Sequence, residues 1–153
     1  MDATEVIARL NDDLTGEVEA VLVYMNHHFV VPQHHTQLEM LEIALEEMHH
    51  IQQLAEVIVD LGGAPELTPR QIRFNGADVA GSLANGTMLE TEAIDGYRRH
   101  IAEIDDPAIK RMLNRIMEEE ELHFAKFSEM LADFEAAAAA TAPTVGDLTG
   151  DGE

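Results

Sequence analysis

Two short segments of the 153-residue chain carry metal-binding residue types at a helical spacing. Glu47-Met48-His49-His50 and Glu120-Glu121-Leu122-His123 each place a glutamate three residues before a histidine. On a helix of about 3.6 residues per turn, side chains three positions apart project from the same face. A carboxylate and an imidazole on one face can bind one metal ion, so both segments are candidate halves of a metal site.

The sequence around these segments repeats with an offset of 73 residues. Glu17 precedes Glu47 by the same distance that separates Glu90 from Glu120. The repeat predicts two helical hairpins, each with one glutamate on its first helix and a Glu-x-x-His on its second. This is the ligand set of di-iron and di-manganese carboxylate sites in four-helix bundles. The predicted catalytic and metal-binding residues are Glu17, Glu47, His50, Glu90, Glu120 and His123.

Four carboxylates and two imidazoles suit iron or manganese, with zinc as an alternative. Their four negative charges balance two divalent cations, whereas without metal the carboxylates repel one another and some stay protonated. Metal binding is therefore expected to release protons and to stabilise the fold. We expect Glu47 and Glu120 to bridge the two metals and the other four ligands to bind one metal each. An open side of the cluster would admit O₂ or H₂O₂.

Chance and packing offer simpler interpretations of these residues. A single Glu-x-x-His arises by chance on acidic helices, but two pairs in phase favour a dinuclear site. Tyr24 and Tyr97 also repeat; we expect them to pack in the core, rather than to donate hydrogen bonds to the ligands or to carry a radical. Secondary metal or entry sites are one interpretation of the other six histidines, but adjacent pairs near a loop are expected to be solvent-exposed, and all six are left out of the site. The six are His27, His28, His34, His35, His49 and His100.

Composition narrows the class of protein further. The length fits one domain, and the absence of cysteine excludes disulfides, thiolate zinc sites and iron–sulfur clusters. A net charge of −21 argues against nucleic acid as a partner; it gives a solvated acidic surface, or a field that attracts cations such as Fe²⁺. The N-terminus is acidic and no apolar run reaches membrane-spanning length, so we expect no signal peptide, no membrane contact and a cytoplasmic location.

Apolar residues at helical spacing predict four long helices. The first runs from the N-cap Thr4 to about Val31, and the second from Thr36 to Leu61. The third runs from about Asp78 to Ile104. Asp106-Pro107 starts the fourth, which continues through Phe134 and frays into the alanines that follow.

The connection from Ala64 to about Gly81 is too long for a tight turn between neighbouring helices and fits a crossover to the far end of the bundle. We therefore expect an all-α fold over residues 1–135: a four-helix bundle made of two antiparallel hairpins. Residues 136–153, alanine-rich and then acidic, are expected to form a flexible tail.

Through these residues the sequence resembles the ferritin-like superfamily, and most closely the bacterioferritins. The resemblance covers about residues 4 to 135. It implies a ferroxidase centre: two Fe²⁺ bind, O₂ or H₂O₂ oxidises them, and the ferric product moves on to storage. A homo-oligomer, a dimer or larger, is expected. The matching residues are Glu17 with Tyr24, Glu47-Met48-His49-His50, Leu61-Gly62-Gly63-Ala64-Pro65, Glu90, and Glu119-Glu120-Glu121-Leu122-His123.

The resemblance to bacterioferritins also bears on whether the protein binds haem and which assembly it forms. In bacterioferritins the methionine beside the bridging glutamate ligates a haem shared across a two-fold dimer, and Met48 occupies that place; filling of a core gap is the alternative. No fifth helix follows the fourth, which puts the usual 24-subunit shell in doubt. A rubrerythrin-like protein would carry a glutamate where Ala93 stands and a cysteine-rich iron domain, which this chain lacks.

The C-terminal tail contains a second resemblance. Thr144-Val145-Gly146-Asp147-Leu148, after the alanine-rich spacer, is similar to the peptides that load ferritin-like cargo into encapsulin nanocompartments. In that case the encapsulin shell would store iron and this protein would oxidise it. The alternative is a plain disordered terminus.

The predicted function is thus that of a di-iron ferroxidase in iron storage or detoxification. Two alternatives remain open. One is a peroxide-consuming di-iron or di-manganese protein, similar to rubrerythrin or manganese catalase. The other is a metal-stabilised structural or cargo bundle without turnover.

Overall fold

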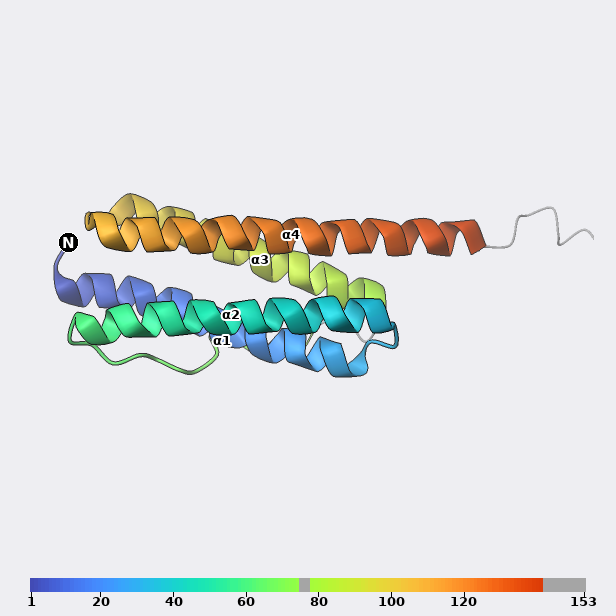
Figure 1. The fold of residues 1–153 in the computed structure, drawn as a ribbon, viewed down its shortest axis with the longest axis horizontal. Coiled ribbons are helices and arrows are strands. Elements are labelled where there is room, and N and C mark those ends of the chain that lie inside the picture. Colours follow the sequence, from blue (N-terminus) through green and yellow to red (C-terminus); the bar gives the residue numbers. More distant parts are fainter. Residues whose placement is uncertain (75–77, 142–153) are drawn as a thin grey trace, which may run out of the picture.

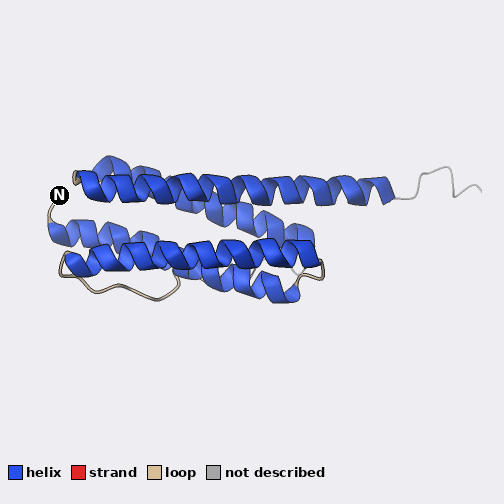
Figure 2. Cartoon of the chain, viewed as in Figure 1, coloured by secondary structure: helices blue, strands red, loops and turns tan. Residues whose placement is uncertain are grey.

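Four long helices form one elongated bundle in the computed structural model, which describes residues 1–74 and 78–141 (Figure 1, Figure 2). Helix α1 packs mainly against α2, and α3 against α4. The described residues contain no strand, so the predicted all-α four-helix bundle is confirmed. The helices are α1 (Ala3–Val30), α2 (His34–Asp60), α3 (Val79–Glu103) and α4 (Pro107–Thr141).

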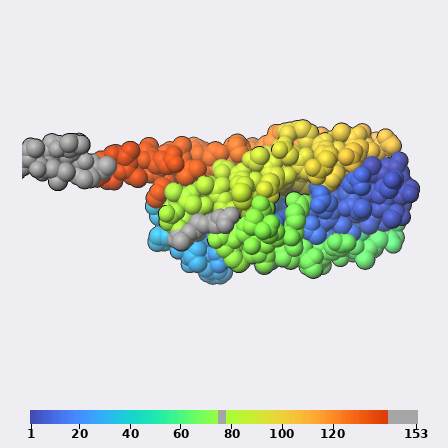
Figure 3. All heavy atoms as spheres, turned by 180° about the vertical axis from the view of Figure 1, so that it is seen from behind, coloured from blue at the N-terminus to red at the C-terminus, as the bar shows by residue number. Residues whose placement is uncertain are grey.

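The connection between α2 and α3 is the crossover expected from the sequence. The link from α1 to α2 is short, whereas the chain leaves α2 at one end of the bundle and begins α3 at the other (Figure 1). Residues 64–74 therefore travel along the bundle, and from behind they lie between α1 and α3 (Figure 3).

Side chains at the helix starts explain where each helix begins. Asp2, and not Thr4, caps α1: the Asp2 carboxylate accepts from the Glu5 backbone N–H at 2.9 Å, and the Glu5 side chain accepts from the Asp2 N–H in return. The prediction of Thr4 was wrong because Asp2 satisfies two backbone donors at once. Asp106 caps α4 as predicted, with its carboxylate 2.7 Å from the Ala108 N–H.

Other helix ends differ slightly from the expected ones. Helix α2 begins at His34, two residues before Thr36, and is not capped by a side chain. It ends as the chain turns at Gly62, whose φ of +83° is a left-handed conformation that favours glycine. Helix α4 continues through Thr141, so the predicted start of the flexible tail at residue 136 was wrong: residues 136–141 are helical, because the alanines favour helix.

The apolar core is divided into two clusters along the bundle. One cluster gathers around Leu10, Leu54 and Leu113. The other gathers around Val23, Met40 and other side chains nearer the far end. Six buried glutamates and histidines lie in the sequence between these clusters on the four helices, so their polar layer occupies the middle of the bundle. They are Glu17, Glu47, His50, Glu90, Glu120 and His123. Among the described residues, no helix carries an apolar stretch long enough to cross a membrane.

Two glycines of α3 give a test of this packing. A Cβ on Gly86 would lie 2.8 Å from the Phe127 ring, which packs against Tyr24 with centroids 5.1 Å apart. Gly86→Ala should therefore lower the free energy of unfolding by about 1–3 kcal/mol. A Cβ on Gly96 would lie 3.5 Å from Asp13, an ordinary contact, so Gly96→Ala should raise it by about 0.5–1 kcal/mol through helix propensity. Urea unfolding followed by circular dichroism measures both; a stabilised Gly86→Ala variant would contradict this packing.

Candidate metal centre

All six residues predicted as ligands lie together in the middle of the bundle, and each is at most 3% exposed. Their ligand atoms form two groups, in each of which all atoms lie within 4.8 Å of one another. Glu47 from α2 and Glu120 from α4 belong to both groups. Glu17 and His50 complete the first group, and Glu90 and His123 complete the second.

The two imidazoles face the same pair of carboxylates. The His50 Nδ1 atom lies 2.8 Å from Glu47 Oε2 and 2.8 Å from Glu120 Oε1. The His123 Nδ1 atom lies 3.0 Å from Glu47 Oε1 and 3.2 Å from Glu120 Oε2. The ring centroids are 6.0 Å apart. Each imidazole thus has Nδ1 directed to the carboxylates that two metal ions would share, and the donor set fits two divalent cations in charge and type.

The other ring nitrogen of each histidine is held by a carboxylate from the opposite hairpin. The His50 Nε2 atom lies 2.7 Å from Glu119 on α4, and the His123 Nε2 atom lies 2.6 Å from Glu46 on α2. A metal-binding histidine usually donates its second N–H to such a partner, which fixes the ring and its tautomer. No such role was predicted for Glu46 and Glu119, although the 73-residue offset matches these two positions.

Tyr24 and Tyr97 do not only pack in the core; both also donate hydrogen bonds to predicted ligands. The Tyr24 hydroxyl on α1 donates to Glu90 on α3 at 2.5 Å, and the Tyr97 hydroxyl on α3 donates to Glu17 on α1. Both side chains are fully buried. The interpretation that favoured packing was incomplete, because each hydroxyl finds its partner on a ligand of the other hairpin. These bonds restrain the Glu17 and Glu90 carboxylates.

Burial changes the acidity of the carboxylates when no metal is bound. Burial, with the nearby Glu17 and Glu90 carboxylates, raises the pKa of Glu47 to about 7. Burial and the Glu120 charge also raise the pKa of Glu90 well above its usual value. Protonated carboxyls therefore relieve part of the repulsion in the metal-free centre.

The pKa values of the two imidazoles are raised, which keeps both rings charged. Burial opposes a charge on His123, but its bonds to Glu120 and Glu47 outweigh burial and raise its pKa to about 12. The pKa of His50 is raised for the same reason, against the effect of burial. Without metal, two imidazolium ions thus neutralise part of the carboxylate charge. Metal binding at Nδ1 must displace their protons.

Two histidines left out of the predicted site are buried. His27, which was expected to be exposed with its neighbour His28, is 0% exposed, and His100, which matches it in the repeat, is 2% exposed. The His100 Nδ1 atom lies 2.8 Å from Asp13, whose pKa burial raises to about 6. Asp12 extends this cluster to the surface, where Arg70 and Arg99 approach its carboxylate at 3.3 and 3.5 Å. The 73-residue repeat could have predicted the burial of these two histidines, because they occupy matched positions.

The remaining candidate residues lie elsewhere. Met48 is 54% exposed on the outer face of α2, so it does not fill a core gap. His34, His35 and His49 are exposed. The segment Thr144–Leu148 lies outside the described residues.

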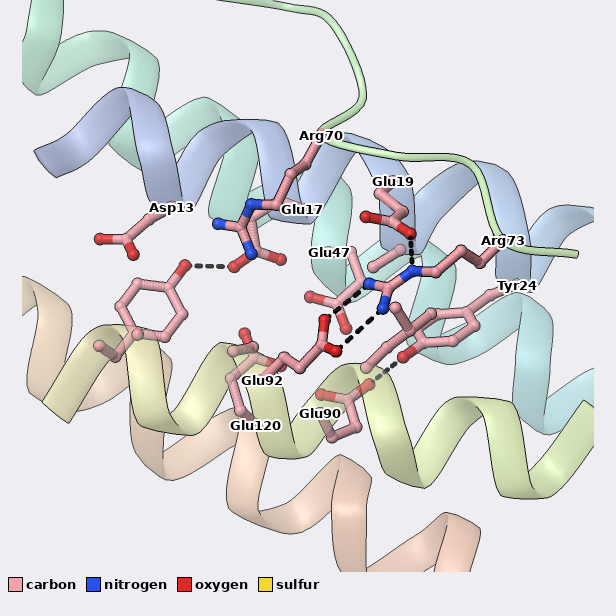
Figure 4. A pocket seen from close by; sticks show the side chains of 16 residues that line it. Asp13, Glu17, Glu19, Tyr24, Glu47, Arg70, Arg73, Glu90, Glu92 and Glu120 are labelled. Atoms are coloured by element: carbon pink, nitrogen blue, oxygen red, sulfur yellow. Dashed lines mark hydrogen bonds and ion pairs between the residues drawn. The ribbon is translucent and has the colours of Figure 1, made fainter. Parts of the chain in front are cut away.

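A cavity of about 30 Å³ opens on the four glutamate ligands from the side of α1 and α3 (Figure 4). That volume holds one or two water molecules. Arg70 and Arg73 of the crossover extend over it, and Arg73 joins Glu19 on α1 to Glu92 on α3 (Figure 4).

Comparisons with known proteins agree with this fold and site. A family model described as a ferritin-like domain matches residues 7–137. A bacterioferritin from Desulfovibrio desulfuricans is 28% identical over 132 residues, which are 82% of this chain and 74% of that protein.

Solved structures are similar over most of their length. A dodecameric thioferritin, the bacterioferritin-related protein from Bacteroides fragilis, has a TM-score of 0.86 and 25% identity over 94% of each chain. The Desulfovibrio desulfuricans bacterioferritin, with its diiron site, has a TM-score of 0.83 and 26% identity over 88% of this chain and 82% of that one. A ferritin-like diiron-carboxylate protein from Bacillus anthracis has a TM-score of 0.79 and 26% identity over 86% of this chain and 98% of that one.

The chain therefore belongs to the ferritin-like family. Its buried cluster of glutamates and histidines is of the type that holds two metal ions in diiron-carboxylate proteins.

The raised pKa values predict how the metal-free protein responds to pH. A group with a higher pKa in the folded state stabilises the fold at low pH, and this contribution is lost as pH rises. Glu47 loses its contribution between about pH 4.5 and pH 7, and His123 loses its contribution between about pH 6.5 and pH 12. The melting temperature in chelator should therefore fall from about pH 5 to about pH 8, and bound divalent metal should reduce this fall.

Two isosteric variants on α2 separate the centre from the acidic surface. Glu47→Gln should flatten the decrease of melting temperature below about pH 7, whereas Glu42→Gln, at an exposed position, should leave it unchanged. The assignment to Glu47 fails if both variants follow the wild-type curve.

The contact between His50 and Glu119 predicts an effect on metal affinity. Glu119→Gln keeps the size of the side chain but removes the charge that fixes the Nε2–H of His50. Titration calorimetry with Zn²⁺ should show affinity lower by roughly 10- to 100-fold. Glu118→Gln, at the neighbouring exposed position, is the control and should bind as the wild type does. Equal affinities for the two variants would show that Glu119 does not orient the ligand.

Proposed function

We propose that this protein is a di-iron ferroxidase, which oxidises Fe²⁺ to Fe³⁺ with O₂ or H₂O₂ in iron storage or detoxification. The observation that carries the proposal is the pair of buried ligand groups that share Glu47 and Glu120. Two metal positions that share two carboxylates lie close enough for one oxidant to react with both ions. The ferritin-like family and the diiron sites of its relatives support iron as the metal.

Each side chain of the centre has a role in this reaction. Glu47 and Glu120 would bridge the ions, while Glu17 with His50 and Glu90 with His123 would bind one ion each. Two bound Fe²⁺ ions would supply two electrons, which together with two protons reduce either O₂ to H₂O₂ or H₂O₂ to two waters.

The surrounding residues keep the ligands in place through this change of charge. Tyr24 and Tyr97 hold Glu90 and Glu17 through their hydroxyls. Glu46 and Glu119 keep the Nε2–H bonds of the imidazoles, so that Nδ1 remains the ligand atom. Burial of the centre limits access of bulk water.

Assembly and targeting form part of the same proposal. The relative from Bacteroides fragilis is dodecameric, which supports a homo-oligomer here. Apolar side chains exposed on α1 and α2, among them Leu22, Phe29, Leu45 and Met48, provide a surface for contact between copies. A haem at Met48, an encapsulin shell as partner of Thr144–Leu148, a flexible tail and a cytoplasmic location stay predictions.

Iron loading tests the proposed activity. Two Fe²⁺ per chain are bound without oxygen, and the ferric absorbance is followed after mixing with air. The wild type should oxidise the two bound Fe²⁺ ions in a single turnover. In Glu47→Ala and Glu120→Ala the rate of this oxidation should be lower by more than about 100-fold, because a ligand shared by the two ions is lost. Glu42→Ala and Glu118→Ala change exposed residues of the same helices and should oxidise iron at the wild-type rate.

Other outcomes distinguish the alternative functions. Rapid consumption of H₂O₂ without net iron oxidation would indicate a peroxide-consuming protein. No ferric absorbance in the wild type, despite bound metal, would indicate a structural bundle. Either result would contradict the ferroxidase proposal.

A further inference from the structure

The crossover places a positive charge between two matched glutamates at the outer end of the cavity. The Arg73 guanidinium donates to Glu19 on α1 at 2.8 Å, and to both oxygens of Glu92 on α3 at 2.9 and 2.6 Å. Glu19 and Glu92 are related by the same 73-residue offset as the ligands. We call these three residues the Arg73 clamp.

The Arg73 clamp and the candidate metal centre share one cavity. Glu19, Arg73 and Glu92 line it at the outside, and the four glutamate ligands line its inner end (Figure 4). Asp13 also lines the cavity, and its Oδ2 atom is buried and has no hydrogen-bond partner among the described residues. Carboxylates thus line the cavity from its outer end to the centre, in a space that holds one or two water molecules or a small ion.

The opposite face of the centre is arranged differently. The groove between α2 and α4 reaches only one of the six ligands, His123. On that face Glu46 and Glu119 already occupy the distal nitrogens of both imidazoles. The side of α1 and α3 is therefore where a cation meets the ligand carboxylates directly.

We propose that Glu19 and Glu92 form an entrance site for a divalent cation and that the Arg73 guanidinium is the counter-ion which the entering cation displaces. This inference rests on the proposed function, since it requires that the centre binds metal. It adds a binding site, a path and an order of events to that function.

The burial of the two carboxylates explains why displacement requires a cation. Glu92 is 42% exposed, so its pair with Arg73 is weak and opens readily. Glu19 is 1% exposed, so loss of Arg73 leaves a buried charge that is costly unless another cation replaces it. An arriving divalent ion provides that replacement and then moves to the stronger ligands within.

The crossover can release the Arg73 side chain without leaving the bundle. Its backbone is held independently: Arg70 N–H donates to the Thr15 carbonyl at 2.9 Å, Glu66 N–H donates to Asn11 at 2.9 Å, and Asn85 donates to the Arg73 carbonyl at 2.8 Å. Removal of the guanidinium should therefore leave the loop in place.

Binding kinetics of Co²⁺ test the proposal without turnover. In stopped-flow absorbance, Arg73→Gln should bind Co²⁺ faster than wild type by roughly two- to fivefold, because the ion pairs of Arg73 with Glu19 and Glu92 no longer have to open. Arg98→Gln is the matched control: it removes one positive charge from α3, where Arg98 pairs with Asp95 outside the cavity. Its rate should equal that of the wild type.

A second variant narrows the cavity itself. Ala93 lines the cavity, and Ala93→Leu should slow Co²⁺ binding. Ala132→Leu, at an exposed position of α4, should bind at the wild-type rate. Thermal unfolding of each variant confirms that it is folded, and equilibrium titration should give two Co²⁺ per chain in all of them.

The proposal is overturned if either cavity variant binds at the rate of its matched control while the titration still gives two ions per chain; the metal centre would then stand and the entrance would lie elsewhere. If the wild type binds no Co²⁺ at all, the metal centre and the entrance site both fail.

Discussion

Compensation of buried charge is the constraint on which this structure depends. Four glutamates and two histidines lie in the middle of a bundle, between two apolar clusters of the core. Such a layer persists only if each charge meets an opposite charge or a hydrogen-bond donor. In the metal-free protein, imidazolium ions, retained protons and two tyrosine hydroxyls serve this purpose. Two metal ions would replace the protons with a closer match of charge, which connects folding, pH and metal binding.

The fold follows from the need to bring these residues to one level of the bundle. Each helix contributes its ligands near its middle, so two antiparallel hairpins must align in register. The crossover allows this by returning the chain along the whole bundle before α3 begins. Because it runs over α1 and α3 only, the two faces of the centre differ: arginines cover one, and glutamates bonded to the histidines line the other.

The repeat in the sequence was sufficient to predict the helices and to select the six clustered residues. Matched Glu-x-x-His segments constrain which helix faces meet, and burial of the whole set agrees with that prediction. Contacts that depend on side-chain reach between hairpins were not predictable in the same way. Whether Tyr97 bonds to Glu17 or simply packs depends on the rotation of α3 against α1, which periodicity within one helix does not define. The contact of Asp13 with His100 depends likewise on how α1 packs against α3, and the position of Arg73 depends on the path of the loop.

The interlocked ligand sets have a mechanical consequence. Each of the two groups takes residues from both hairpins: an ion in the first position would join α1 and α2 to α4, and an ion in the second would join α2 to α3 and α4. The tyrosine and outer glutamate bonds cross the same boundary between the hairpins. In a chain without cysteine, these contacts take the place of covalent cross-links, so a displacement of one hairpin is transmitted to the ligands of the other.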